Sequence, residues 1–259
     1  MTPSPFPPAL PYDEWEDTKA TLHLVSQIVG KIKLTTQPKQ PHWWHATLRV
    51  TPRGVSTGPI FERGGSFALE IDVHDLRLQL HDSEGVRDGF ALAGASIAKV
   101  YANTMDLLGR TGHETEIFAK PFDKPHSELP FAKDETHGSW DHDAIRRWWM
   151  SMTFTEEVFR SFAGRSFMRT SPVQLFWHSF DLAVTRFTGR RSPSFGEGGR
   201  RSDVEAYSHE VISFGYWPGD PDVRFPAYYS YTAPEPEGLS HRRIHPEEAG
   251  WQELPSSHL

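Results

Sequence analysis

The apolar and aromatic run at residues 172–189, PVQLFWHSFDLAVTRFTG, constrains the fold more than any other stretch of this chain. It is too long and too regularly patterned for a loop, and it has a counterpart at residues 42–58, HWWHATLRVTPRGVSTG. Each run contains a Trp-His pair and then a Val-Thr pair, an arginine and a glycine. We interpret the two runs as an internal repeat, the key strands of two related half-domains.

Alternation of apolar and polar residues predicts antiparallel sheets with one buried face. In the later run, Leu182 and Val184 fall on the same face as His178. Asp181 and Thr185 fall on the opposite face. The same pattern predicts further strands at residues 45–51, 55–60, 67–74, 76–81, 114–119, 207–217 and 227–233.

Apolar residues at three- and four-residue steps predict helices over residues 13–32, 93–108 and 141–162. Asp13 and Asp141 stand where an N-cap is expected, and Gly30 lies where the first helix would weaken. His23 and Gln27 are four residues apart and share one face of that helix. We interpret them as a solvated pair; the alternative is a pair of polar groups pointing into a cleft.

These elements predict an α+β fold of two similar halves, each an antiparallel sheet packed on helices. The two sheets form either a shared curved sheet or an open barrel. The predicted organisation is a proline-rich arm at 1–11, a first half at 12–120, a linker at 121–140, a second half at 141–233 and an irregular tail at 234–259. The second half lacks a counterpart of the helix at 93–108, which leaves a face open or covered by a partner or the arm.

The composition excludes several classes of protein. A net charge of −7 argues against a large nucleic-acid surface, so nucleic acid is not an expected partner. No apolar run approaches the ~20 residues of a membrane span. The first residues, MTPSPFPPALPY, have neither the basic region nor the apolar core of a signal peptide. We therefore expect a cytoplasmic protein that contacts no membrane and, having no cysteine, uses no thiolate.

Familiar catalytic motifs are absent from the sequence. It contains no Walker loop, no GxGxxG after a strand, no GxSxG and no HExxH. No nucleotide cofactor is therefore expected, and whether the protein is an enzyme stays open.

His42 and His45, together with His209, are the candidate metal ligands. Neutral imidazoles bind zinc, copper or iron, so a divalent metal is a possible cofactor. Strand residues three apart face opposite sides, however, and His42 and His45 could share a metal only if Pro41 bends the chain. The alternative is a turn with partly buried His and Trp side chains.

His45, Asp181 and His209 are the candidate catalytic residues. His209 lies beside Glu210 and could act as a general base, although a surface histidine at a strand start is the alternative. Asp181 interrupts an apolar strand and therefore needs a polar partner. It is an acid or base, or else the ion-pair partner of Arg49 or Arg186.

The candidate ligand-binding residues are basic, hydroxyl-bearing or aromatic. Arg49 and Arg186, in the two repeated runs, could bind an anionic group. The remaining candidates, which could line a pocket for a ring-bearing molecule, are Thr185, Trp217, Tyr229 and Tyr231. Packing in the core is the alternative for the aromatic residues.

Five segments of the chain resemble a family of uncharacterised bacterial proteins classed as a domain of unknown function. They are SQIVGKIKL (26–34), HWWHATLRVTPRG (42–54), SPVQLFWHSFDLAVTRFTGR (171–190), AYSHEVISFGYWPGD (206–220) and YYSYTAPEP (228–236). The resemblance implies no activity. The family pattern usually has glycine at the position of His178, so the resemblance implies no shared catalytic role for His178.

The sequence thus predicts a protein that binds a small anionic or aromatic molecule in a His-, Trp- and Tyr-lined cleft between two halves. Such a protein could be a metal-dependent or acid/base enzyme. The alternative is a non-catalytic interaction module whose aromatic strands dock a partner or a second copy, as a homodimer.

Overall fold

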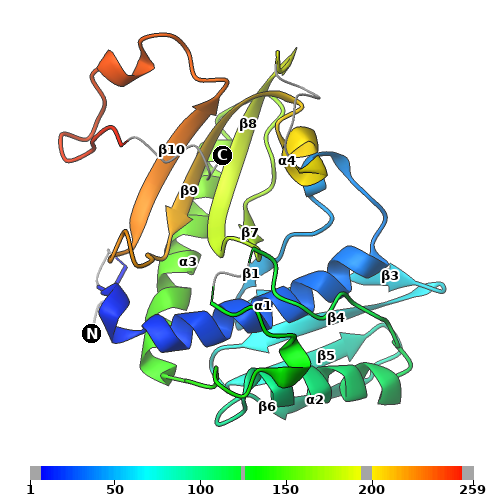
Figure 1. The fold of residues 1–259 in the computed structure, drawn as a ribbon. Coiled ribbons are helices and arrows are strands. Elements are labelled where there is room, and N and C mark those ends of the chain that lie inside the picture. The colour runs from blue at the N-terminus through cyan, green and yellow to red at the C-terminus, as the bar shows by residue number, and fades with distance from the viewer. Residues whose placement is uncertain (1–6, 124–125, 194–199, 253–259) are drawn as a thin grey trace.

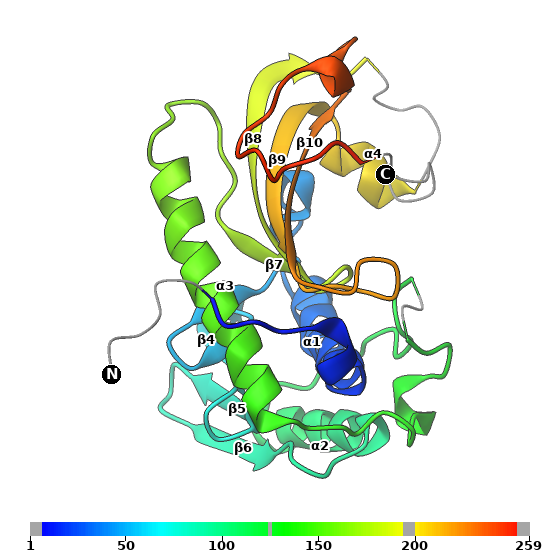
Figure 2. The same cartoon turned by 90° about the vertical axis from the view of Figure 1, so that its left-hand side faces the viewer.

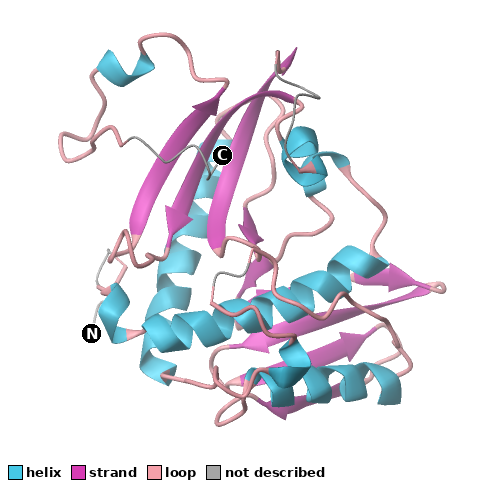
Figure 3. Cartoon of the chain, in the orientation of Figure 1, coloured by secondary structure: helices cyan, strands magenta, loops and turns pink. Residues whose placement is uncertain are grey.

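A computed structural model describes residues 7–123, 126–193 and 200–252 of the chain. The fold is α+β, as expected, with two antiparallel sheets and helices packed on and between them (Figures 1 and 3). Within the described residues, no helix is both long and apolar enough to cross a membrane.

The first sheet has six strands in the order β1-β2-β4-β5-β6, with β3 paired to β4. The strands are β1 (Arg49–Thr51), β2 (Gly54–Ser56), β3 (Ile60–Glu62), β4 (Gly65–Asp72), β5 (Arg77–Asp82) and β6 (Arg87–Ala91). Phe67, Leu69 and Ile71 alternate into the core as predicted. Strand β6 was not predicted. The strand predicted at 114–119 is wrong, because that segment pairs with no described strand and runs as a loop.

The second sheet has four strands in the order β10-β9-β8-β7. These are β7 (Gln174–Phe176), β8 (Asp181–Arg191), β9 (His209–Trp217) and β10 (Ala227–Ala233), with the short helix α4 (Arg201–Ala206) before β9. The sheets meet where Leu48 and Leu175 exchange two backbone hydrogen bonds of 2.9 and 3.0 Å. They differ in size and strand order, and the equivalence of two halves remains a prediction.

The long run at 172–189 is not one strand. Residues 177–180 form a turn that separates β7 from β8, and Phe180 has a positive φ of 68°. The turn sends Trp177 against Gly30 and lets Phe180 stack between Trp148 and His23. Tertiary packing of large rings thus overrides the local strand pattern.

Helix α1 (Glu16–Thr36) lies at the centre of the molecule, between the two sheets (Figures 1 and 2). Every residue from Thr18 to Lys33 is buried. One expectation about this helix is wrong: Asp13 does not cap it, since Trp15 is the N-cap residue and Asp13 pairs with Arg224. The helix continues past Gly30 to Thr36, and the Trp177 ring packs on that glycine.

Two other helices complete the layers. Helix α2 (Ile97–Arg110) packs beside the first sheet, and α3 (His142–Ala163) reaches from the first sheet to the second (Figure 2). Asp141 caps α3, as predicted, because its side chain accepts a hydrogen bond of 3.0 Å from the Ala144 N–H.

Candidate functional site

The polar residues of the second sheet gather on one face. The period of two along each strand directs Leu182, Val184 and Phe214 towards the α3 side, where Phe214 meets Phe162. The opposite face carries the residues of the candidate site: Asp181, Thr185, Ser213, Trp217, Tyr229 and Tyr231. This face lies in front of the sheet in Figure 1, on the side of α4.

Asp181 is the centre of the site. Its side chain is buried, with 6% of the residue exposed. One carboxylate oxygen accepts a hydrogen bond from the Ser179 hydroxyl, and the other accepts one from the Tyr229 hydroxyl. No described arginine or lysine forms an ion pair with it, so the expected pairing with Arg49 or Arg186 is wrong. Within the described part of the chain, this buried carboxylate therefore has only neutral hydrogen-bond donors as partners.

Gly215 explains how Tyr229 reaches Asp181 from two strands away. Gly215 in β9 pairs with Tyr229 in β10 and with Ala183 in β8. A Cβ atom at Gly215 would lie 2.0 Å from a carbon of the Tyr229 ring. The absence of a side chain therefore allows the ring to lie across β9 and to place its hydroxyl on β8.

Two further tyrosines extend this network. The rings of Tyr229 and Tyr231 stack with centroids 6.0 Å apart, and the hydroxyls of Tyr231 and Tyr207 are 2.8 Å apart. Thr185 and Ser213 share a hydrogen bond of 2.9 Å. Burial raises the pKa of Tyr207, Tyr229 and Tyr231. These hydroxyls are therefore neutral at physiological pH and can donate as well as accept.

His178 lies next to this network. Burial lowers the pKa of its imidazole, although the Asp181 and Asp123 carboxylates oppose that shift. The ring meets Phe122 edge-on at 5.7 Å, and no hydrogen bond joins it to another described side chain. A neutral imidazole in this position can accept a proton.

Two histidines, the buried His23 and the half-buried His126, support the turn from the side of α1. His23 Nε2 lies 3.0 and 3.1 Å from the carbonyl oxygens of Trp177 and His178, so that nitrogen carries the proton. His23 Nδ1 then accepts a hydrogen bond of 3.1 Å from His126 Nε2. Burial lowers the pKa of His126 to about 3 and that of His23 well below its usual value. The pair is neutral at physiological pH.

His23 and Gln27 are therefore buried, and their interpretation as a solvated pair is wrong. The Gln27 side-chain amide forms two hydrogen bonds with the Phe122 backbone. Its Nε2 donates to the carbonyl at 3.3 Å, and its Oε1 accepts from the N–H at 2.7 Å. Lys19, one turn before His23, is also buried and has no hydrogen-bonding side-chain partner among the described residues. Its ammonium lies 5.3 Å from the Tyr12 ring centroid and 5.7 Å from that of Trp217. Burial lowers the Lys19 pKa to about 8.

The predicted metal ligands are only partly brought together. The rings of His42 and His209 lie 5.8 Å apart, and His42 Nδ1 donates to the Ala206 carbonyl at 3.1 Å. His45 instead stacks on Trp43, and its Nδ1 accepts from the Gln40 N–H at 3.1 Å. Both His42 and His45 are buried in a turn. No group of three or more potential metal ligands is present among the described residues.

The two predicted anion-binding arginines hold backbone carbonyls. Arg49 Nη1 donates to the Val173 carbonyl at 3.2 Å and to Gln174 Oε1 at 3.3 Å. Arg186 donates a hydrogen bond to the Phe162 carbonyl, and its Cζ lies 3.5 Å from the centroid of the Phe162 ring. Arg186 thus connects β8 to α3, and Arg49 connects β1 to the start of β7; neither forms a described ion pair with Asp181.

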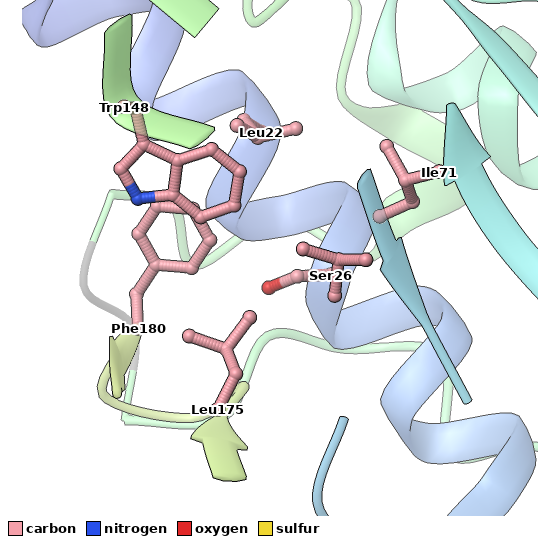
Figure 4. Close-up of a pocket in the computed structure, with 7 residues that line it drawn as sticks. Leu22, Ser26, Ile71, Trp148, Leu175 and Phe180 are labelled. Atoms are coloured by element: carbon pink, nitrogen blue, oxygen red, sulfur yellow. The ribbon is translucent and has the colours of Figure 1, made fainter. Parts of the chain in front are cut away.

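Two hollows lie outside this network. Figure 4 shows a narrow apolar gap between α1, the first sheet and the turn at 177–180, which has no room for a water molecule. Trp148 and Phe180 stack across it. The second, of about 230 Å³, is lined mainly by acidic residues at the N-terminal ends of α1 and α3.

Several residues of this network were not predicted as site residues. Tyr207 is the first residue of the strand predicted at 207–217, and His126 lies in the expected linker. Lys19 was not predicted because the helical periodicity identifies only the apolar face of residues 13–32, and Lys19 lies outside that face. Its four-residue spacing to His23, Gln27 and Lys31 was the available signal.

Comparison with known families gives one match. The family described as "Family of unknown function (DUF5996)" matches residues 7–259. No curated protein and no solved structure matches the chain.

Proposed function

The chain belongs to this family of unknown function, and we propose that it binds a small molecule on the polar face around Asp181, Tyr229, Tyr231 and Tyr207. The observation that carries the proposal is the buried Asp181 carboxylate, which has two hydroxyl partners and, among the residues that the structure describes, no cationic partner.

A purely structural role explains this carboxylate poorly. Burying a charged group is unfavourable unless it is paired, and stable folds pair such groups with a cation or replace them by apolar residues. A carboxylate can accept about four hydrogen bonds, and two described donors reach Asp181. The remaining acceptor capacity suits hydrogen-bond donors of a ligand.

The surrounding groups suggest the chemistry of that ligand. Asp181 favours a ligand with hydroxyl or amino donors, while Tyr207 and Thr185 can donate or accept. The Tyr229, Tyr231 and Trp217 rings offer flat faces to a ring-bearing molecule. We therefore favour a neutral or cationic ring-bearing molecule with hydroxyl or amino groups. An anionic ligand has less support, because Arg49 and Arg186 hold carbonyl groups elsewhere.

The same groups could perform acid/base chemistry on a bound molecule. Asp181 could accept a proton from a ligand hydroxyl and later return it, and neutral His178 could relay a proton by accepting at one ring nitrogen as it donates from the other. A metal-dependent reaction has no comparable support, since His45 points away from the His42–His209 pair.

Binding can be tested by a thermal-shift and calorimetric screen of monosaccharides, catechols and aromatic amines. We expect hits whose affinity falls about 10- to 100-fold in Asp181→Asn and Tyr229→Phe, the loss of about 1.5–3 kcal/mol for a hydrogen bond to a charged group. Tyr228→Phe is the matched control, because the Tyr228 hydroxyl bonds Thr155 on the α3 side. Hits that bind the three variants and the wild type equally would refute the proposal.

The alternative, a protein-interaction module, has one specific observation in its favour. Strand β10 is an edge strand of the second sheet and carries the exposed Tyr228.

A further inference from the structure

Strand β10 presents an unpaired edge. It occupies one end of the second sheet, whereas β7 at the other end meets Leu48 of the first sheet. Among the described residues, only β9 forms backbone hydrogen bonds with Ala227–Ala233. Such an edge leaves a row of N–H and C=O groups that can pair with another strand.

This edge lacks the features that usually protect an edge strand. Proteins block free edges with charged residues, prolines or bulges. Strand β6, an edge of the first sheet, follows this rule with Arg87 and Asp88. Strand β10 reads AYYSYTA, with no charged residue and no proline, and all seven of its residues pair with β9 without a bulge.

The residues of β10 are nearly symmetric about Ser230. An antiparallel second copy centred on Ser230 would place alanine opposite alanine at the two ends and tyrosine opposite tyrosine beside the centre. Tyr229 would face the partner's Tyr231, and Tyr228 would face the partner's Thr232. The Tyr229 ring lies over β9, away from this edge, so backbone hydrogen bonds between the two strands would hold the copies together. Both copies would use the same surface, as a two-fold dimer requires.

We propose that two copies of this chain pair through β10, antiparallel and centred on Ser230, so that their second sheets form one continuous sheet. Tyr229 and Tyr231 lie on the candidate site face, so each copy adds its Tyr231 beside the partner site. The proposal does not rest on ligand binding. A seven-residue edge is a small interface, so the dimer is weak and depends on concentration.

The absence of cysteine from the natural sequence allows a test of the register. Ser230→Cys places two thiols opposite each other at the two-fold axis. Thr232→Cys, the matched control on the same strand face, places each thiol opposite the partner's Tyr228. Under mild oxidation at high micromolar concentration, we expect a disulfide-linked dimer from Ser230→Cys and little from Thr232→Cys. Equal or greater cross-linking of Thr232→Cys would overturn the proposed register.

Sedimentation equilibrium of the wild type from low to high micromolar concentration tests the dimer itself. We expect a reversible monomer–dimer equilibrium that Ser230→Lys weakens at least tenfold, because two like charges would lie opposite each other. A wild type that remains monomeric throughout, or a dimer that Ser230→Lys leaves unchanged, would overturn the proposal. Circular dichroism shows whether the Ser230→Lys variant is folded. If it is not, the cross-linking of Ser230→Cys compared with Thr232→Cys tests the dimer instead.

Discussion

Replacement of Gly30 by alanine should destabilise the protein, although alanine is the better helix former. Gly30 lies inside α1, and a Cβ there would be 2.3 Å from Cγ and Cδ1 of Trp177. The Trp177 ring cannot easily withdraw, because its Nε1–H donates a 2.7 Å hydrogen bond to the Ala46 carbonyl. The ammonium of Lys31 also lies 5.5 Å from the centroid of the Trp177 ring.

The magnitude follows from two opposing effects. Alanine in place of glycine stabilises a helix interior by about 1 kcal/mol. Forcing a methyl group into a packed site destabilises by about 1–3 kcal/mol when neighbours adjust. Expelling a buried tryptophan with ~200 Å² of surface would remove about 5 kcal/mol. Adjustment is the smaller loss, so we expect the free energy of unfolding to fall by up to about 2 kcal/mol in Gly30→Ala.

Urea denaturation followed by tryptophan fluorescence measures this difference. Gly109→Ala in α2 is the matched control, since the nearest atom to its added Cβ is Glu114 Oε1 at 3.8 Å. We expect that variant to be unchanged or more stable by up to about 1 kcal/mol. A Gly30→Ala protein as stable as Gly109→Ala would show that the Trp177 contact does not limit this position.

Three further predictions concern the site and its supports. Between about pH 7 and pH 5, protonation linked to His126 should lower the free energy of unfolding by about 2 kcal/mol. The His126 pKa is 6.5 in the unfolded state and about 3 in the folded state, so in this range only the unfolded state takes up a proton. Urea titrations at several pH values should show that the free energy of unfolding depends less steeply on pH in His126→Gln than in the wild type. An unchanged dependence on pH would contradict this. Gly215→Ala should displace the Tyr229 ring and lower the affinity for a ligand, measured by calorimetry, at least as much as Tyr229→Phe does. An unchanged affinity would show that Tyr229 does not contribute to binding. Asp141→Ala should lower the free energy of unfolding by about 1 kcal/mol through loss of the α3 cap, and an unchanged urea midpoint would show that the cap contributes nothing.

The sequence was informative wherever one periodicity acted alone. Alternation placed Asp181 and Thr185 on one strand face, and the helical period found α2 and α3 with the Asp141 cap. The period of two also applies to β10, which directs Tyr229 and Tyr231 to that same face.

Prediction failed where distant packing decided the structure. Nothing local marks the turn at 177–180, because it exists to place Trp177 on Gly30 and Phe180 beside Trp148. The burial of His23 likewise depends on carbonyl groups that lie more than 150 residues further along the chain. A periodic pattern identifies one face of α1 as apolar but cannot show that a second layer covers the polar face as well.

The position of α1 has a consequence for how this protein is made. The helix leaves the ribosome before its partners are made, because Lys19 packs near Trp217 and the Tyr12 N–H just before the helix donates to the Arg224 carbonyl. Its partners are therefore synthesised about 200 residues later. Long-range contacts of this kind slow folding and join the two sheets in one cooperative unit. The nascent chain must keep the apolar face of this helix from aggregating until residues 217–224 have been translated.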